Sequence, residues 1–139
     1  MFSTVVGVLL RRSIKALNAG DIGPALSSYA EDAVLVFPGE STFGGSYRGR
    51  SEIEPFLRRF VDLGLQMQVD KVVATGLPWR MTVYVEARDH TKEQAGGQPV
   101  YANRLVIVCR AKWGRITHQE DYLDTQRVAG YDAHRAAAG

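Results

Sequence analysis

The spacing of apolar residues changes about half-way along this chain of 139 residues. In the first 62 residues, apolar positions recur mainly at the spacing of an amphipathic helix. In most of the rest they alternate with polar positions, as they do in strands. This change of period predicts an α+β protein in which helices come first and most strands follow.

Three helices and one short strand are predicted in the first part of the chain. The first helix covers about 4–17, and the second begins at Asp21 and carries Tyr29. A short apolar strand follows at 33–37. The third helix is expected to begin at Ser51, because the run Ser-Glu-Ile-Glu has the spacing of a capping box.

Longer strands are predicted in the second part, at about 66–75, 80–91, 100–111 and 115–124. The segment from Gln126 to Gly139 is rich in alanine and polar residues, so we expect it to fray or to form a loose helix. No repeat or linker divides the chain. We therefore expect one domain over residues 1–125 and a C-terminal tail over residues 126–139.

Composition narrows the class of protein. A hydrophobic content of 45% excludes a disordered chain, and a net charge of +2 gives no indication of a nucleic-acid-binding surface. Cys109 is the one cysteine, so the chain cannot form an internal disulfide. No apolar run approaches the roughly 20 residues of a membrane-spanning helix, and the start lacks the charge and cleavage pattern of a signal peptide. We expect a cytoplasmic protein with neither nucleic acid nor a membrane as its partner.

Several local stretches resemble the NTF2-like superfamily, in the order in which that superfamily has them. Residues 16–21 with 29–34, and residues 47–53, resemble the opening of ketosteroid isomerase and SnoaL-type cyclases and their entry to the third helix. Residues 114–116 and 120–124 resemble the closing strand of SnoaL-like proteins and limonene epoxide hydrolase. The resemblance implies a cone: a curved, mostly antiparallel sheet that encloses a pocket with three N-terminal helices.

The catalytic residues of ketosteroid isomerase do not carry over to this chain. Its aspartate base corresponds to Phe37, which cannot take up a proton, and its oxyanion-hole tyrosine corresponds to Ser13. Because a fold does not determine an activity, the resemblance gives no support for steroid isomerisation.

The site of limonene epoxide hydrolase carries over in part. Its last-strand aspartate corresponds to Asp121, and its Arg-x-Asp pair corresponds to Ala87 and Asp89, so the arginine is missing. The tyrosine and asparagine that help to hold the attacking water correspond to Val34 and Val36. The resemblance therefore keeps both carboxylates and loses the other three groups.

Strand alternation, considered without any family, brings the same carboxylates together. Odd-numbered positions on the long strands share one face, and four polar residues lie on it: Asp89, Asn103, Gln119 and Asp121. We predict that they converge on an apolar pocket, where two carboxylates would have different pKa values. In this hypothesis Asp121 is the general base, Asp89 is the acid or an orienting partner, and the two amides donate to a substrate oxygen. The predicted walls are Phe37, Phe56, Phe60, Trp79, Met81 and Leu105.

A structural role for the two carboxylates is the alternative. A carboxylate near a strand end can be a solvated rim residue or an ion-pair partner of Arg88, Arg104 or Arg115. For Asn103 a structural hydrogen bond competes with ligand binding. The histidines match no strong metal-binding motif, so we predict no metal and no cofactor.

These patterns predict a small-molecule enzyme of SnoaL-like type. It would use carboxylate acid/base chemistry on an apolar, oxygen-bearing substrate, in epoxide opening, cyclisation, isomerisation or dehydration. The alternative is a non-catalytic ligand-binding or dimerisation module. The expected partners are a hydrophobic small molecule and a second copy of the chain on the sheet face, because the strands carry apolar residues on both sides.

Overall fold

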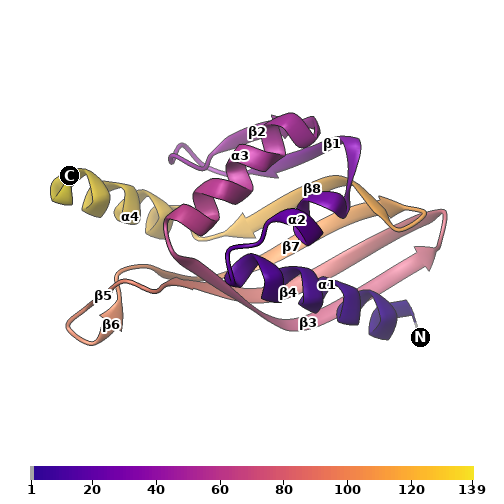
Figure 1. Cartoon of the computed structure of the whole chain (residues 1–139), viewed down its shortest axis with the longest axis horizontal. Helices are drawn as coiled ribbons and strands as arrows, with labels where there is room; N and C mark the ends of the chain where they lie inside the picture. Colours follow the sequence, from indigo (N-terminus) through magenta and orange to yellow (C-terminus); the bar gives the residue numbers. More distant parts are fainter. Residues whose placement is uncertain (1) are drawn as a thin grey trace.

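The chain forms a curved six-stranded sheet with helices against one of its faces (Figure 1), in a computed structural model that describes residues 2–139. The elements in chain order are α1 (Phe2–Asn18), α2 (Gly23–Ser27), β1 (Tyr29–Phe37), β2 (Gly45–Arg48), α3 (Gly49–Asp62), β3 (Leu65–Leu77), β4 (Arg80–Thr91), β5 (Gln94–Ala95), β6 (Gln98–Pro99), β7 (Ala102–Lys112), β8 (Arg115–Leu123) and α4 (Thr125–Ala138).

The sheet has the strand order β2-β1-β8-β7-β4-β3. β1 and β8 run parallel, and every other neighbouring pair is antiparallel. The short strands β5 and β6 pair only with each other. The register shifts at a bulge between Val69 and Lys71, which increases the bend of β3. The predicted α+β fold with a curved, mostly antiparallel sheet is thus confirmed.

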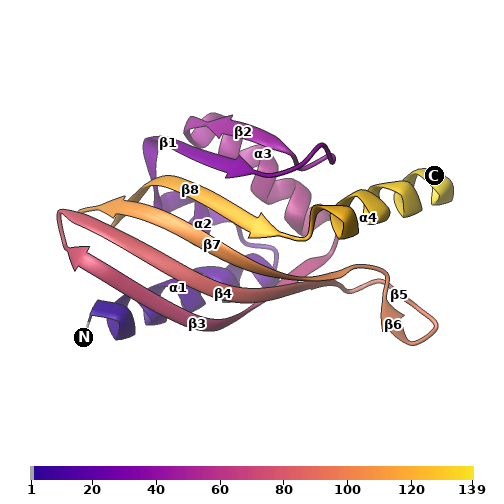
Figure 2. The same cartoon turned by 180° about the vertical axis from the view of Figure 1, so that it is seen from behind.

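Alternation along β4 and β7 separates a buried face from an exposed one. On β4 the odd positions from Val83 to Thr91 are buried while the even positions between them are exposed. The buried face points toward the helices, and Figure 2 shows that no helix covers the opposite face. Side chains of the odd positions therefore form the inner wall of the molecule.

The helices are fixed to the sheet by both packing and hydrogen bonds. The apolar stripe of α3 is buried as its helical spacing predicts, at Ile53, Phe56, Leu57 and Phe60. At the end of α1 the Asn18 amide donates to the Met67 carbonyl at 2.7 Å and accepts from the Met67 N–H at 2.9 Å. This pair of bonds joins the C-terminal end of α1 to β3.

Two helix boundaries differ from the prediction. Tyr29 begins β1 and is not part of α2, which ends at Ser27. α3 begins two residues before Ser51, and the Glu52 carboxylate reaches back to accept the Arg48 N–H at 2.9 Å. The acidic residue therefore satisfies an orphan donor of the helix start, as in a capping box, but Ser51 is not the cap.

The C-terminal segment is a fourth helix, so three N-terminal helices alone do not form the cone. The Asp124 carboxylate caps α4 by accepting the N–H groups of Gln126 at 3.0 Å and Arg127 at 3.3 Å. Val128 and Tyr131 are buried in the main core. The tail that we expected to fray is held by these two contacts and by its cap.

No helix in the described part of the chain is long and apolar enough to cross a membrane.

Candidate active site

An apolar cavity of about 100 Å³ lies between the inner face of the sheet and the helices. Its walls come from α1, α2, α3 and α4 and from five strands, β1, β3, β4, β7 and β8. Phenylalanines at positions 37, 43 and 56 pack with ring centroids 5.6–5.9 Å apart on one side of it. Among the described residues that line the cavity, none is lysine, arginine or histidine.

Asp121 belongs to a buried chain of hydrogen bonds on the cavity wall. The Tyr29 hydroxyl donates to Gln119 Oε1 at 2.6 Å, and Gln119 Nε2 donates to Asp121 Oδ1 at 3.0 Å. Asp121 is 6% exposed, and burial raises its pKa to about 6 although the Gln119 hydrogen bond partly opposes this. The amide is therefore oriented by Tyr29 to stabilise an ionised Asp121.

Asp89 lies in the same cavity without such support. It is 8% exposed, and its Oδ1 atom is buried with no hydrogen-bond partner among the described residues. Burial first, and then the negative charge of Asp121, raise the pKa of Asp89 to about 7. A buried carboxyl with one unpartnered oxygen holds its proton at a pH at which its neighbour has lost one.

Neither aspartate forms an ion pair with the arginines named as alternatives. Arg88 pairs with Asp70 at 2.8 Å, on the exposed side of the sheet. The Arg115 guanidinium donates to the Ser27 carbonyl at 3.2 Å. Both carboxyls instead line the cavity, so the two aspartates are not solvated rim residues.

Some, but not all, of the residues that strand alternation predicts in the cavity wall line the cavity. Phe37, Phe56, Phe60 and Leu105 line the cavity together with Gln119, Asp89 and Asp121. Trp79 does not, because it lies in the β3–β4 turn, is 49% exposed and packs against Trp113 with ring centroids 6.0 Å apart. Met81 packs against the second core cluster, which β4 and β7 form, and is not a lining residue.

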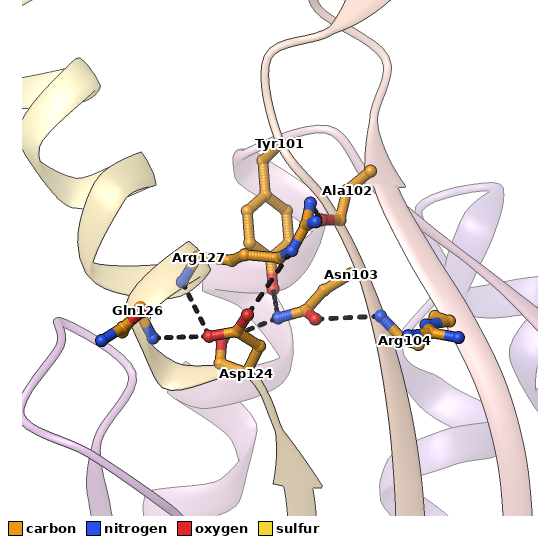
Figure 3. A network of polar contacts seen from close by, with 7 residues as sticks. All are labelled: Tyr101, Ala102, Asn103, Arg104, Asp124, Gln126 and Arg127. Carbon is orange, nitrogen blue, oxygen red and sulfur yellow. Dashed lines mark hydrogen bonds and ion pairs between the residues drawn. The ribbon is translucent and has the colours of Figure 1, made fainter.

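Asn103 is buried but does not line the cavity. Its Nδ2 donates to the Tyr101 hydroxyl oxygen and to the Asp124 carbonyl, both at 3.0 Å, and its Oδ1 accepts the Arg104 N–H at 2.9 Å (Figure 3). Both amide hydrogens are thereby used within the protein. The structure therefore does not bear out Asn103 as a direct donor to substrate, and its amide connects β7 to the start of α4.

The comparisons with known proteins agree with this fold. A family model described as a SnoaL-like domain matches residues 10–119. The chain belongs to the SnoaL-like domain family. A comparison with curated protein sequences finds no match for this SnoaL-like domain.

Solved structures show the same fold at low sequence identity. An NTF2-like protein from Anabaena variabilis has a TM-score of 0.69 and 21% identity, over 91% of this chain and 92% of the other. An LEH-like epoxide hydrolase from M. tuberculosis has a TM-score of 0.67 and 20% identity, over 99% and 96%. TerC, co-crystallised with polyporic acid, has a TM-score of 0.66 and 21% identity, over 87% and 92%.

Sequence reasoning missed several residues of the cavity in this SnoaL-like domain. The sequence pattern places Tyr29 in a helix, Tyr101 at the edge of a strand, and Val128 and Tyr131 in the expected tail, but all four line the cavity. The spacing of Val128 and Tyr131, one helical turn apart, was the available signal for a buried helix face. For Tyr29 the signal was its place directly before an apolar strand.

In residues 2–139 no three His, Cys, Asp or Glu side chains are grouped so that they could hold a metal ion. His118 lies 3.3 Å from Glu120, in a pair of side chains that are each 37% exposed.

Proposed function

We propose that this SnoaL-like protein is a cofactor-independent acid/base enzyme that adds water to a small, apolar epoxide. The observation that carries the proposal is the difference between two buried carboxyls in one apolar cavity. Asp121 accepts a hydrogen bond from the Gln119 amide and has a pKa of about 6. Asp89 has no hydrogen-bond partner at Oδ1 among the described residues and has a pKa of about 7. Such a pair supplies a base and an acid at the same pH. The fold shared with an LEH-like epoxide hydrolase adds support.

In the proposed reaction, ionised Asp121 takes a proton from a water molecule as the water oxygen bonds to an epoxide carbon. The carbon–oxygen bond of the ring breaks, and protonated Asp89 gives its proton to the leaving oxygen. The product is a vicinal diol. Asp121 then holds a proton and Asp89 is ionised, so a proton must pass from Asp121 to Asp89, directly or through solvent, before the next turnover.

Cyclohexene oxide is a suitable test substrate because it is small, uncharged and apolar. We expect the purified protein to form trans-cyclohexane-1,2-diol, detected by chiral gas chromatography. Asp121→Asn should abolish the reaction, and Asp89→Asn should lower the rate by about 100-fold or more, the usual range for losing a general acid. Asp70→Asn is the matched control, because Asp70 is an exposed carboxylate that pairs with Arg88.

A single turnover in H₂¹⁸O separates direct water attack from attack by a carboxylate. Direct attack puts the label into the diol, whereas an ester intermediate would leave it in Asp121. Labelled protein and unlabelled diol would overturn the mechanism. Absence of diol from this epoxide and from other small epoxides would overturn the proposed function.

A non-catalytic ligand-binding module is the second candidate, and one position favours it. Ala87 is buried on the same face as Asp89, where the resemblance to limonene epoxide hydrolase would require an arginine. Without that cation, the cavity has no permanent positive charge to hold the pair in a fixed geometry. Binding of cyclohexanone without any turnover of cyclohexene oxide would support this second candidate.

We also propose that the protein is a homodimer through the uncovered face of the sheet (Figure 2). Large apolar side chains on that face are exposed, among them Tyr84, Val106 and Tyr122. Val106 and Tyr122 are cross-strand partners, so they form one continuous patch. Sedimentation velocity should give a dimer for the wild-type protein and a monomer for Val106→Arg, and a monomeric wild type at millimolar concentration would contradict the proposal.

A further inference from the structure

Tyr101 is a cavity tyrosine whose hydroxyl has one unused hydrogen. It is 7% exposed and lines the cavity with Asp89. Its oxygen accepts the Asn103 amide at 3.0 Å (Figure 3). Among the described residues, the Tyr101 hydroxyl accepts this bond and donates none. The cavity tyrosine Tyr29 differs from Tyr101, because its hydroxyl hydrogen is already used in a hydrogen bond to Gln119.

The surroundings of Tyr101 make its hydroxyl a fixed and strengthened donor. The Asn103 amide holds the phenol oxygen and polarises the O–H bond, because chained hydrogen bonds reinforce one another. The ring stacks on Tyr131 of α4, with centroids 5.2 Å apart and an interplanar angle of 28°. Burial and the charge of Asp89 raise the pKa of Tyr101, so the hydroxyl keeps its proton at neutral pH.

The charges around the cavity define the class of ligand that this donor can serve. Two carboxyls line the cavity, and its described lining residues include no basic side chain. A carboxylate or phosphate ligand would thus be buried beside negative charge with no compensating cation. An uncharged molecule with an acceptor oxygen would instead satisfy the donor without adding charge.

We infer that the Tyr101 hydroxyl is a substrate-binding donor, which together with Asp89 selects a small uncharged ligand carrying an acceptor oxygen, such as an epoxide, ketone or aldehyde. The inference rests on the proposed function in that both use one cavity and one substrate oxygen. It assigns to Tyr101 the role that the sequence suggested for Asn103. Asn103 becomes a positioning residue that acts through Tyr101.

Binding without turnover tests this inference independently of the reaction. Three probes of similar shape are titrated into ¹⁵N-labelled protein and followed by NMR: cyclohexanone, methylenecyclohexane and cyclohexanecarboxylate. Cyclohexanone has an acceptor oxygen, methylenecyclohexane replaces that oxygen with CH₂, and the third probe is an anion. At pH 6.5, where Asp89 holds its proton and Asp121 is ionised, we expect cyclohexanone to bind most tightly and the carboxylate not to bind.

The variant Tyr101→Phe should weaken cyclohexanone binding about fivefold, the usual effect of one neutral hydrogen bond, and leave methylenecyclohexane binding unchanged. The C=O stretch of bound ¹³C-cyclohexanone should move to higher frequency in this variant. Tyr84→Phe is the matched control, because it removes an exposed tyrosine hydroxyl on the uncovered face of the sheet, away from the cavity. It should leave both readouts at wild-type values.

Each contrary result has a definite meaning. An unchanged C=O frequency in Tyr101→Phe would refute the donor role, and equal affinity for cyclohexanone and methylenecyclohexane would refute it as well. Tight binding of the carboxylate, or no binding of either uncharged probe, would refute the ligand class. If cyclohexanone binds as expected while cyclohexene oxide is not hydrolysed, the inference stands and the proposed function fails.

Discussion

Replacing Asp89 by asparagine should make the protein gain stability relative to wild type as the pH rises from 4 to 8. Burial and the charge of Asp121 raise the pKa of Asp89 from 3.8 to about 7. The folded chain therefore holds a proton on Asp89 that the unfolded chain releases, and the free energy of unfolding falls as the pH rises from about 4 to about 7. At about 1.4 kcal/mol for each pKa unit, a rise of about three units costs roughly 4 kcal/mol once Asp89 is ionised.

The variant Asp89→Asn cannot ionise, so it escapes this cost. We expect its free energy of unfolding, relative to wild type, to increase by about 2 to 4 kcal/mol between pH 4 and pH 8. The lower value allows for relaxation and for water that enters the cavity. Any constant penalty for burying the amide is the same at both pH values and cancels in the comparison.

Urea unfolding followed by far-UV circular dichroism at pH 4, 6 and 8 measures this difference. Asp70→Asn is the control of opposite sign, because the Arg88 hydrogen bonds lower the pKa of Asp70. That carboxylate contributes stability above its ordinary pKa, and the contribution is lost as the pH falls. A stability difference between Asp89→Asn and wild type that does not change with pH would refute the reasoning about Asp89.

Three further results are expected. The rate of diol formation should follow a bell-shaped pH profile. It should rise near pH 6 as Asp121 ionises and fall near pH 7 as Asp89 loses its proton. A flat profile from pH 5 to 8 would contradict this prediction. Tyr29→Phe should lower the urea midpoint, at a cost of about 1 kcal/mol, because the buried Gln119 oxygen loses its donor at 2.6 Å and keeps the weaker Cys109 thiol contact at 3.8 Å. The same variant should move the acid limb of the pH profile to higher pH. Asp124→Ala should cost about 1 kcal/mol of unfolding free energy through loss of the α4 cap, measured by the same urea titration.

The inner face of the sheet was predictable because strand geometry leaves little freedom. Side chains alternate across a strand, so once the ranges 80–91 and 115–124 were assigned, Asp89 and Asp121 had to share the face of their odd-numbered neighbours. β4 covers Arg80–Thr91, as predicted, and both carboxyls are buried. Alternation predicts the face of the sheet on which a side chain lies, but not whether its position along the strand is level with the cavity. Trp79 lies beyond the end of the sheet, in a turn, and therefore misses the cavity.

The fourth helix was less predictable, for a thermodynamic reason. Its sequence is rich in alanine and polar residues, and a helix of 14 residues is marginal by itself in water. Burial of Val128 and Tyr131 in the core and the Asp124 cap stabilise it. These are tertiary contacts, which the local pattern does not contain. The same is true of Asn103, whose partners Tyr101 and Asp124 meet only when β7 and α4 come together.

The absence of an arginine at position 87 helps to explain why the pKa values of both Asp89 and Asp121 are raised. With Ala87 at the position that the resemblance assigns to an arginine, burial raises both pKa values, the Gln119 amide lowers that of Asp121, and Asp89 feels the charge of Asp121 and a backbone hydrogen bond. The amide supports Asp121 alone, so the first proton to leave comes from Asp121, and its charge then delays ionisation of Asp89. A pair of this kind carries one negative charge near pH 6.5, the state that base and acid roles require.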